Sequence, residues 1–587
     1  MLKLVKFLKP FWRGIILIVL LLLGQAMAEL FLPTLMAYIV NEGIVAPVIN
    51  ETGSRTYFIL QMGLLMLFVA LLAGAASISV GYLSPKIAAG AARALRRELF
   101  TKVENFSQAE FDKFSSASLI TRCTNDVGQV QSLANVFARM LLYAPIMGIG
   151  GIAMAMTRSV SMSWIIGLAV IVLIGLVVIV VSIVMPKFKI IQEMTDRLNK
   201  VSREILHGLM VIRAFGTQNH EKNRFDKANT DLRDMGLFVG RVMAIVGPAI
   251  TFIVGGTQIL VIWVGAHQIA GSSMQIGDMM AFMQYAMQVI FAFMMISMVL
   301  VMVPRAQVSA ARIVEVLDTD LSITDPENPI VFDDNANQRG IVTLDNVSFR
   351  YPNAEADAIE NISFTALPGQ TTAIIGATGS GKSTIAQLIL RLYDVTRGAI
   401  SVDGVDIRHV TQSSLRKKMG YVPQKGQLLS GTIESNISYG NPTAAKEEIS
   451  KAAEIAQALD FITEKEDSFG FEISQGGSNV SGGQRQRLSI ARALAKDPEI
   501  LIFDDSFSAL DFQTDTKLRK ALKEYAGNAT MIVVAQRVGT IMNAEQIIVL
   551  DEGKIVGKGT HTELLKSCPA YNEIAISQGI AEVEIHG

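Results

Sequence analysis

The sequence has little cysteine, little charge and no excess of basic residues. Two cysteines, Cys123 and Cys568, occur in 587 residues, which excludes a disulfide framework or a cysteine-rich zinc site. Charged residues make up 18% of the chain and the net charge is −1, so we expect no nucleic-acid partner. Hydrophobic residues make up 50% of the chain, which excludes an intrinsically disordered protein.

The hydrophobic residues are concentrated in the first 304 positions. A helix needs roughly 18 to 20 apolar residues to cross the hydrocarbon core of a membrane, and six segments reach that length. Buried helices of a large soluble protein are the alternative, but six charge-poor runs of this length favour membrane spans. We predict transmembrane helices at about 14–40, 56–85, 140–157, 159–186, 242–270 and 279–304.

Basic residues then predict the orientation of these helices. The segment 86–139 carries eight Lys or Arg and 187–241 carries eleven, whereas the connections on the other side contain only Arg55 and Arg158. The positive-inside rule places the N-terminus, both long loops and everything after Pro304 in the cytoplasm. We therefore predict a multi-pass protein of the cytoplasmic membrane, with the lipid bilayer as a partner. The two long loops have helical periodicity and are interpreted as extensions of the membrane helices.

The N-terminal segment also resembles a secretory signal, because Ala26-Met27-Ala28 imitates a cleavage site. The apolar run continues to Val40, which favours a membrane span instead. Residues 2–12 alternate basic and bulky apolar side chains and are predicted to form a short amphipathic helix in the membrane surface.

The pattern changes after Pro304. We predict a transmembrane domain over 1–304, a polar linker over 305–340 and a second domain over 341–587. In the second domain, short β-rich stretches alternate with helical ones, which predicts an α/β domain with a largely parallel sheet. The β-rich stretches are 341–349, 371–375, 500–503, 531–535 and 546–550.

A phosphate-binding loop follows the predicted strand 371–375. Its glycines allow backbone N–H groups to surround phosphate oxygens, and the next helix adds the positive end of its dipole. Lys382 is expected to reach the β- and γ-phosphates, and the Ser383 hydroxyl to ligate Mg²⁺. The loop reads Gly376, Ala377, Thr378, Gly379, Ser380, Gly381, Lys382, Ser383, Thr384, which is G-x-x-x-x-G-K-[ST] between a strand and a helix.

Two aspartates, Asp504 and Asp505, follow the apolar strand 500–503. A carboxylate at the carboxyl end of such a strand can hold the magnesium shell, and we assign Asp504 to that role.

Between these motifs lies the string Ser481, Gly482, Gly483, Gln484, preceded by Val480 and followed by Arg485. With the phosphate-binding loop, this string identifies the chain as resembling an ATP-binding cassette (ABC) transporter. Six spans ahead of one cassette resemble a bacterial half-exporter of the multidrug and lipid type.

The resemblance implies ATP and Mg²⁺ as cofactors and a second half-transporter as partner. It implies that Ser481, Gly482, Gly483 and Gln484 contact a nucleotide bound to the partner. It further implies that Tyr351 stacks on adenine and that Gln424 approaches Mg²⁺.

Three further segments match parts of the family. By this resemblance, 508–511 is the loop exchanged between cassettes, while 107–121 and the region near 212–216 are the loops that dock on the cassettes.

Three positions depart from the family pattern. The family usually has glutamate where this chain has Asp505, and an Asp carboxylate is one methylene shorter, to which general-base geometry is sensitive. The family has histidine where this chain has Gln536, and an amide cannot carry an imidazolium charge. Gln475 stands where glutamate is common. We predict a weakly hydrolysing ATP site in a heterodimeric exporter, with Asp505, Gln536 and Lys382 as its catalytic positions.

Several alternatives remain open at this stage. They are a homodimeric lipid or peptide exporter, an importer built on the exporter fold, and a non-transporting ATP-binding regulator of a membrane partner. The sequence does not identify the substrate beyond a small amphipathic compound.

The transmembrane segments contain two features that suggest a substrate pathway. Gln25 and Glu29 share one face of the first span, and an acidic residue within a membrane is a functional-site candidate. We hypothesise that Glu29 favours cationic amphiphiles, with a role in helix packing as the alternative. Methionines, which suit varied apolar ligands, follow helical spacing in the last span, although ordinary packing explains any one of them equally well. They are Met280, Met283, Met287, Met294, Met298 and Met302, with Gln284 and Gln288 nearby.

Overall fold

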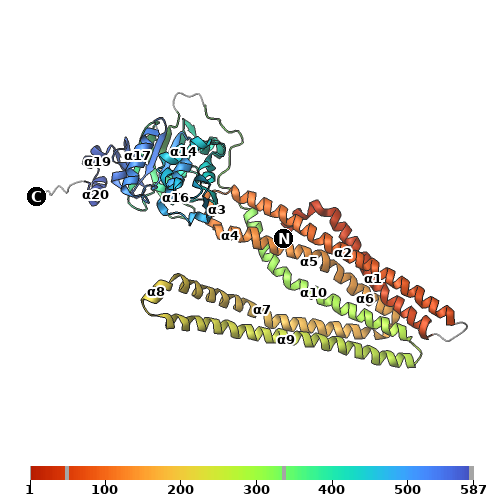
Figure 1. The fold of residues 1–587 in the computed structure, drawn as a ribbon. Helices are drawn as coiled ribbons and strands as arrows, with labels where there is room; N and C mark the ends of the chain where they lie inside the picture. Colours follow the sequence, from red (N-terminus) through yellow and green to blue (C-terminus); the bar gives the residue numbers. More distant parts are fainter. Residues whose placement is uncertain (1, 46–51, 334–338, 526, 581–587) are drawn as a thin grey trace. The chain divides into compact units, whose positions relative to one another are not determined.

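The computed structural model of the chain describes residues 2–45, 52–333, 339–525 and 527–580 (Figure 1). The chain folds into two compact units. The membrane unit comprises Met1–Glu104 and Ala117–Thr319, and the cassette unit comprises Asn105–Ser116 and Asp320–Gly587. Part of the predicted linker, residues 334–338, lies outside the described residues.

The membrane unit is entirely helical in its described part. Within that part, six segments are long and apolar enough to cross a membrane. Their main helices are α1 (Trp12–Tyr38), α2 (Thr52–Glu104), α6 (Leu142–Arg158), α7 (Ser163–His207), α9 (Gln218–Ala270) and α10 (Ile276–Leu317). In Figure 1, α7 and α9 run side by side, as do α1 and α2.

Shorter helices complete the membrane unit. They are the 3₁₀-helices η1 (Leu2–Phe11) and η5 (Val160–Met162), the π-helical stretches η2 (Ile39–Val45), η3 (Arg122–Asp126) and η4 (Phe137–Leu141), and the α-helices α4 (Ser116–Thr121), α5 (Val127–Val136) and α8 (Leu209–Ala214).

The outward faces of the long helices carry large apolar side chains. Leu64, Ile78 and Ile149 are 70%, 76% and 72% exposed. An exposed apolar surface of this extent is unfavourable in water and favourable in hydrocarbon. The fold class predicted from the sequence, a helical transmembrane domain of about six spans followed by an α/β domain, is confirmed.

Three of these helices continue well beyond their apolar segments. α2 reaches Glu104, α7 reaches His207 and α9 begins at Gln218, so the two long loops contain helical extensions. α10 also continues past Pro304, to Leu317. The helix persists there because Ala306, Ala310 and Ile313 recur at helical spacing and are almost completely buried.

The cassette unit is built on three sheets. The central one has the strand order β12-β11-β3-β10-β9-β6, in which all pairs are parallel except β11–β12. Its strands are β3 (Thr371–Gly376), β6 (Met419–Val422), β9 (Ile500–Asp504), β10 (Thr530–Val534), β11 (Gln546–Asp551) and β12 (Lys554–Gly559).

A second, antiparallel sheet has the order β2-β1-β4-β5, and a small one pairs β7 with β8. Their strands are β1 (Val342–Phe349), β2 (Ile359–Ala366), β4 (Arg397–Val402), β5 (Val405–Asp406), β7 (Gly431–Thr432) and β8 (Glu472–Ile473).

Short helices surround these sheets. The α-helices are α3 (Gln108–Phe114), α11 (Lys382–Ile389), α12 (Gln412–Lys417), α13 (Ile433–Ile437), α14 (Lys446–Ile455), α15 (Leu459–Thr463), α16 (Gly482–Leu494), α17 (Phe512–Tyr525), α18 (Val538–Ile541), α19 (His561–Ser567) and α20 (Pro569–Ser577). The 3₁₀ turns are η6 (Ile407–His409), η7 (Ser438–Gly440), η8 (Ser468–Gly470) and η9 (Gln475–Gly477).

The central sheet is covered on both faces, so its middle strands are apolar without alternation. All five residues of β9 are buried, and the last of them is Asp504. Strands β3, β10, β9 and β6 are neighbours and run in one direction, so the loops after their carboxyl ends lie at one edge of the sheet. Asp505 and Gln536 lie on these loops, and Lys382 is the first residue of α11, directly after the loop that follows β3.

Candidate functional site

The loop after β3 has the strained geometry of a phosphate-binding loop. Gly379 and Gly381 have φ of +87° and +95°, in the left-handed region that favours glycine. At Gly376, an added Cβ atom would lie 2.1 Å from the carbonyl oxygen of Leu550 on β11. The glycines are therefore required by backbone conformation and by close approach. Thr378 is exposed at the outer side of the loop, whereas Ser380 is buried.

The ammonium group of Lys382 lies within this loop. Its Nζ donates to the carbonyl oxygens of Gly376 at 2.9 Å and Ala377 at 2.7 Å. The residue is 7% exposed, and burial lowers the pKa of Lys382. The negative charges of Asp505 and Asp504 act in the other direction and raise that pKa. The side chain is already desolvated and directed into the loop, where an anion would gain most from its charge.

Ser383 and Asp504 meet at the base of the loop. The Ser383 hydroxyl donates to Oδ1 of Asp504 at 2.7 Å. A hydroxyl and a carboxylate oxygen so close are the hard ligands that Mg²⁺ accepts, with substrate phosphates completing its shell. Among the described residues, no cluster of three or more His, Cys, Asp or Glu could hold a metal ion. The residues present fit Mg²⁺ in that manner.

Asp505 occupies an unusual backbone position. Its φ is +47°, and the residue is only 8% exposed. Its backbone N–H donates to the carbonyl oxygen of Val534, on the neighbouring strand β10, at 2.9 Å. Strained, non-glycine residues of this kind concentrate at functional sites. Burial raises the pKa of Asp505, although the Gln424 amide and the charge of Lys382 oppose this shift.

Two amides converge on one oxygen of Asp505. Gln536, two residues beyond β10, donates through Nε2 to Oδ2 of Asp505 at 2.8 Å. Gln424, two residues beyond β6, donates through Nε2 to the same oxygen at 3.1 Å. The structure thus brings together Lys382, Ser383, Asp504, Asp505, Gln424 and Gln536, the positions that the sequence assigns to catalysis and metal binding.

The string Ser481–Gln484 lies at the start of α16 and is not part of this cluster. Ser481 caps the helix by accepting from the N–H of Gln484 at 3.2 Å, while its own N–H donates to Oε1 of Gln484 at 3.0 Å. Ser481 and Gly482 are exposed, and nothing lies within 4 Å of where a Cβ of Gly482 would be. Gly483 is half-buried beside them.

Tyr351 lies next to the phosphate-binding loop. Its hydroxyl is 2.9 Å from the Thr384 hydroxyl, on the helix that follows the loop. Its ring makes an edge contact with Tyr393, with 5.4 Å between centroids and an interplanar angle of 88°. Tyr393 in turn donates to Asp112 Oδ2 at 2.6 Å.

Sequence reasoning missed Tyr393, Asp112 and Tyr421. The hydroxyl of Tyr421, on β6, interacts with Asp504, and burial raises its pKa. No local pattern singled out Tyr421, because its contact with Asp504 depends on the pairing of β6 with β9. No pattern linked Tyr393 to Asp112, which are 281 positions apart.

The two predicted docking segments differ in the structure. Residues 105–116 fold with the cassette unit, where Glu110 is buried and its Oε1 accepts from the N–H of Ser322 at 3.0 Å. The segment around α8 belongs to the membrane unit, and its apolar side chains Met210 and Phe215 are each 79% exposed.

Comparison with known proteins gives the family. The family model described as the ABC transporter transmembrane region matches residues 15–293, and the model described as ABC transporter matches residues 359–508. An uncharacterized ABC transporter ATP-binding protein of Mycobacterium tuberculosis (strain ATCC 25618 / H37Rv) is 40% identical over 98% of this chain and 97% of its own length. This chain belongs to the ABC transporter family.

Further similarities show that this ABC transporter is an exporter half-transporter. The solved structure of a bacterial Atm1-family ABC exporter with ATP bound superimposes with a TM-score of 0.78 at 25% identity, covering 98% of this chain and 99% of that chain. An ATP-dependent lipid A-core flippase of Albidiferax ferrireducens is 30% identical over 98% of both chains. ABC exporters act as dimers in the membrane, and the cassette domain of the family binds ATP.

The membrane unit of this ABC transporter contains a small polar pocket around Glu29. Its cavity of about 230 Å³ is bordered by Glu29, Gln284 and Gln288 among apolar residues. Gln25 donates to Oε1 of Glu29 at 2.9 Å, and the Tyr143 hydroxyl donates to Oε2. Gln288 donates to the backbone oxygen of Glu29 at 3.2 Å, while its own buried Oε1 has no hydrogen-bond partner within the described structure. The pocket therefore offers the Gln288 oxygen as an unpartnered acceptor beside the Glu29 carboxylate.

The methionines of α10 differ in how far they are packed. Met283 packs against the core that contains Tyr285 and Phe282, and Met294 packs against Ile290. Met298 is 61% exposed. The six methionines therefore do not form one uniformly open face.

Proposed function

We propose that this chain is one half of a heterodimeric exporter and supplies an ATP site that hydrolyses slowly. The convergence of Gln536 and Gln424 on one oxygen of Asp505 is the observation that carries the proposal. A general base must point its free carboxylate oxygen at the attacking water. Here the carboxylate is one methylene shorter than the usual glutamate, and two amides already donate to one of its two oxygens.

Gln536 adds a second deficit. A histidine at this position would be able to carry a positive charge close to the transferred phosphate. A glutamine amide donates a hydrogen bond but carries no charge, so the developing negative charge receives less stabilisation. Asp505 and Gln536 together favour a site that holds ATP rather than one that turns it over.

The remaining residues are suited to nucleotide binding. Lys382 would neutralise the β- and γ-phosphates, while the backbone N–H groups of residues 376–384 surround their oxygens. Ser383 and Asp504 would hold Mg²⁺, with Gln424 beside them, and the ion would neutralise phosphate charge. The ring of Tyr351 would stack on the adenine base.

The intact string at α16 would complete the partner's site. Ser481 and Gly482, at the start of α16, are both exposed. An exposed helix start binds anions through those N–H groups and the helix dipole. Ser481, Gly482, Gly483 and Gln484 would therefore contact the γ-phosphate held by the other subunit.

The decisive experiment compares the chain alone with the assembled pair in lipid nanodiscs. We expect the isolated chain to bind ATP but to hydrolyse it about 100-fold more slowly than a pair whose partner has Glu and His at the matching positions. Lys382→Ala in the isolated chain should abolish binding and serves as the control. A homodimer of this chain that hydrolyses ATP at both sites as fast as the assembled pair would contradict the proposal.

For the exported compound, we propose a hydrophobic or amphipathic molecule, with a preference for cations. The pocket at Glu29 offers a carboxylate and the unpartnered Gln288 oxygen, a combination that complements an ammonium group. Glu29→Gln should reduce transport of a cationic dye by about tenfold and leave a neutral analogue of similar size unchanged, as a lost charge-assisted contact of about 1.5 kcal/mol implies. Equal transport of both by the variant would assign Glu29 to helix packing.

A homodimeric lipid exporter is the second candidate. The lipid A-core flippase named among the relatives favours it, at 30% identity. Movement of a labelled lipid between leaflets by this chain alone, driven by ATP, would establish that function in place of the heterodimer.

A further inference from the structure

The loop that carries Gln424 is tied to α16 by one buried side chain, that of Gln486. Gln486 lies in the second turn of α16 and is 2% exposed. Its Nε2 donates to the carbonyl oxygen of Pro423 at 3.1 Å, and its Oε1 accepts from the backbone N–H of Gly426 at 3.0 Å. These two backbone groups lie on either side of Gln424 in the chain, so a single amide holds the loop at both ends.

The same loop also lies directly against the backbone of α16. An added Cβ atom at Gly426 would lie 2.9 Å from the carbonyl oxygen of Arg485 and 3.0 Å from the Ser489 hydroxyl. No larger residue fits between the loop and the helix unless one of them shifts. Because close-packed contacts transmit a displacement, packing and hydrogen bonding together favour movement of the loop and the helix as one body.

This connection has Gln424 at one end and Ser481 at the other. Gln424 donates to Oδ2 of Asp505 at 3.1 Å, in the cluster of residues that form this chain's own ATP site. Ser481 caps α16 five residues before Gln486, a distance of about 7.5 Å along a helix. The Gln486 amide therefore lies between this chain's own site and the residues that we propose contact the partner's nucleotide.

The connection requires an amide at position 486. Pro423 offers a carbonyl oxygen and Gly426 an N–H group, so the side chain that joins them must donate at one atom and accept at the other. A glutamate would still accept from Gly426 but would place a second acceptor against the Pro423 oxygen. A methionine has a similar length and would leave both backbone groups without this partner.

We propose that Gln486 is a positioning residue that transmits the occupancy of this chain's own ATP site to the start of α16, and so sets the rate of hydrolysis at the partner's site. The inference rests on the proposed function, in which this chain holds ATP and offers Ser481–Gln484 to its partner. Nucleotide and Mg²⁺ beside Asp505 change the surroundings of Gln424, and the two hydrogen bonds of Gln486 carry the displacement of its loop to the helix. A site that hydrolyses slowly then regulates the other site.

The first test measures amide hydrogen exchange in the full-length chain alone, in lipid nanodiscs, with and without Mg²⁺ and ATP. We expect nucleotide to slow exchange in both 423–427 and 481–487 of the wild type. In Gln486→Glu, exchange should still respond in 423–427 but no longer in 481–487, while ATP affinity stays at the wild-type level. Gln486→Met should give the same result and serves as the second variant.

Asn436→Asp is the matched control for Gln486→Glu. The Asn436 side chain is 1% exposed, and its amide likewise accepts from the N–H and donates to the carbonyl oxygen of one loop residue, Leu429, at 2.9 and 2.8 Å. The substitution makes the same exchange of amide for carboxylate, on α13 instead of α16. This variant should keep the response to nucleotide in 481–487.

The second test is a double-mutant cycle on phosphate release by the assembled pair. Lys382→Ala empties this chain's own site and should slow hydrolysis at the partner's site by about tenfold. Gln486→Met should give a similar loss, and the double variant should lose no more than either single variant, because both changes interrupt one connection. A merely structural role of Gln486 predicts that the two losses multiply to about 100-fold, and that result would overturn the proposal.

The hydrogen-exchange result does not depend on a partner, so it separates this inference from the proposed function. An absent response of 481–487 in the wild type, or an undiminished response in both Gln486 variants, would overturn the inference whatever the rate of hydrolysis. Rapid hydrolysis by the isolated chain would instead contradict the proposed heterodimer and leave the role of Gln486 within the chain standing.

Discussion

The Tyr393 hydroxyl donates a 2.6 Å hydrogen bond to the Asp112 carboxylate. Asp112 lies on α3, in the short segment that connects two helices of the membrane unit yet folds with the cassette. The ring of Tyr393 also contacts Tyr351, the predicted adenine-stacking residue. A continuous path of contacts therefore joins the nucleotide site to the chain segment that continues into the membrane helices.

Tyr393→Phe should weaken this path without removing the ring. The lost hydrogen bond to a charged acceptor is worth about 1.5 to 3 kcal/mol, so α3 should dissociate from the cassette more often. We expect faster amide hydrogen exchange in residues 105–116 and reduced stimulation of ATP hydrolysis by transported compound, with ATP affinity unchanged. Tyr525→Phe, which loses a 2.9 Å bond to Asp497, is the matched control and should leave stimulation intact.

Asp504 makes a prediction about pH. Burial, reinforced by the charge of Asp505, raises the pKa of Asp504 in the folded protein. The folded state therefore binds more protons than the unfolded state between the unfolded pKa of about 3.9 and the raised value, and stability falls as pH rises through that window. At neutral pH the ionised carboxylate is destabilising until a cation binds.

Asp504→Asn should accordingly raise the thermal midpoint of the nucleotide-free protein at pH 8, with a difference that shrinks as the pH falls through the raised pKa of Asp504. The same variant should lose most of the stabilisation that Mg²⁺ and ATP give the wild type, which is about 2.7 kcal/mol at a hundredfold excess over Kd. Asp357→Asn is a control of opposite sign, because hydrogen bonding and charge from Arg350 and Arg397 lower the pKa of Asp357. A lower midpoint for nucleotide-free Asp504→Asn would contradict the argument.

Replacing the two departing residues should restore hydrolysis. Asp505→Glu together with Gln536→His supplies the longer carboxylate and an ionisable ring. We expect ATP turnover by the isolated chain to rise by about 10- to 100-fold, measured as phosphate release. Gln536 also accepts from Gln578 at 2.9 Å through its backbone oxygen, which the substitution keeps. Asp505→Asn with Gln536→His should stay inactive, and equal turnover in both double variants would show that Asp505 is not the limiting group.

Much of this arrangement was predictable from the sequence because it follows strand ends. The phosphate-binding loop and Asp504 each follow an apolar strand visible in the sequence, and parallel strands bring such ends to one edge. Gln424 and Gln536 were instead assigned through the resemblance to the family. Local patterns also predicted the amphipathic N-terminal helix and the helical loops. These features depend on spacing within short windows, which a single sequence displays directly.

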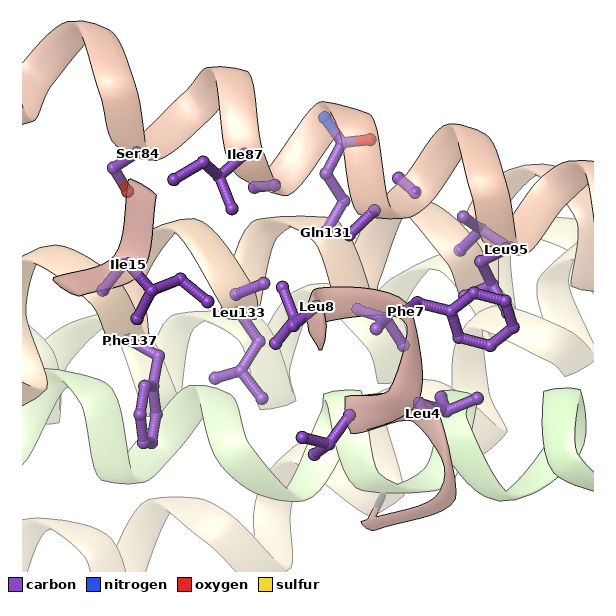
Figure 2. Close-up of a pocket in the computed structure, with 18 of the residues that line it drawn as sticks. Leu4, Phe7, Leu8, Ile15, Ser84, Ile87, Leu95, Gln131, Leu133 and Phe137 are labelled. Atoms are coloured by element: carbon purple, nitrogen blue, oxygen red, sulfur yellow. The ribbon is translucent and has the colours of Figure 1, made fainter. Parts of the chain in front are cut away.

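Other features depend on contacts between distant parts of the chain. Asn105–Ser116 folds with the cassette unit and not with its flanking helices. This depends on the burial of Glu110 and on the hydrogen bond from Tyr393 to Asp112, and no local pattern shows either contact. The convergence of Gln536 and Gln424 on the same oxygen of Asp505 depends on side-chain rotamers. The apolar pocket lined by η1, α2 and α5 (Figure 2) depends on how these helices pack, so it could not be predicted from the sequence.

Substitutions at two glycines should distinguish the chain's own ATP site from the surface that we propose contacts the partner's nucleotide. Gly376→Ala would place a Cβ atom 2.1 Å from the Leu550 carbonyl oxygen, so ATP binding by the chain itself should be lost. Gly482→Ala adds a methyl group where nothing lies within 4 Å, at a helix start, so the fold should be unchanged or stabilised by up to about 1 kcal/mol.

The functional effect of Gly482→Ala should appear only in the assembled dimer. Its methyl group would occupy the space expected for the partner's γ-phosphate, so hydrolysis by the pair should fall by about 100-fold while ATP binding by the isolated variant stays at the wild-type level. The measurement is phosphate release from the pair beside nucleotide titration of the single chain. Wild-type hydrolysis by a pair that contains Gly482→Ala would show that this helix start does not reach the partner's nucleotide.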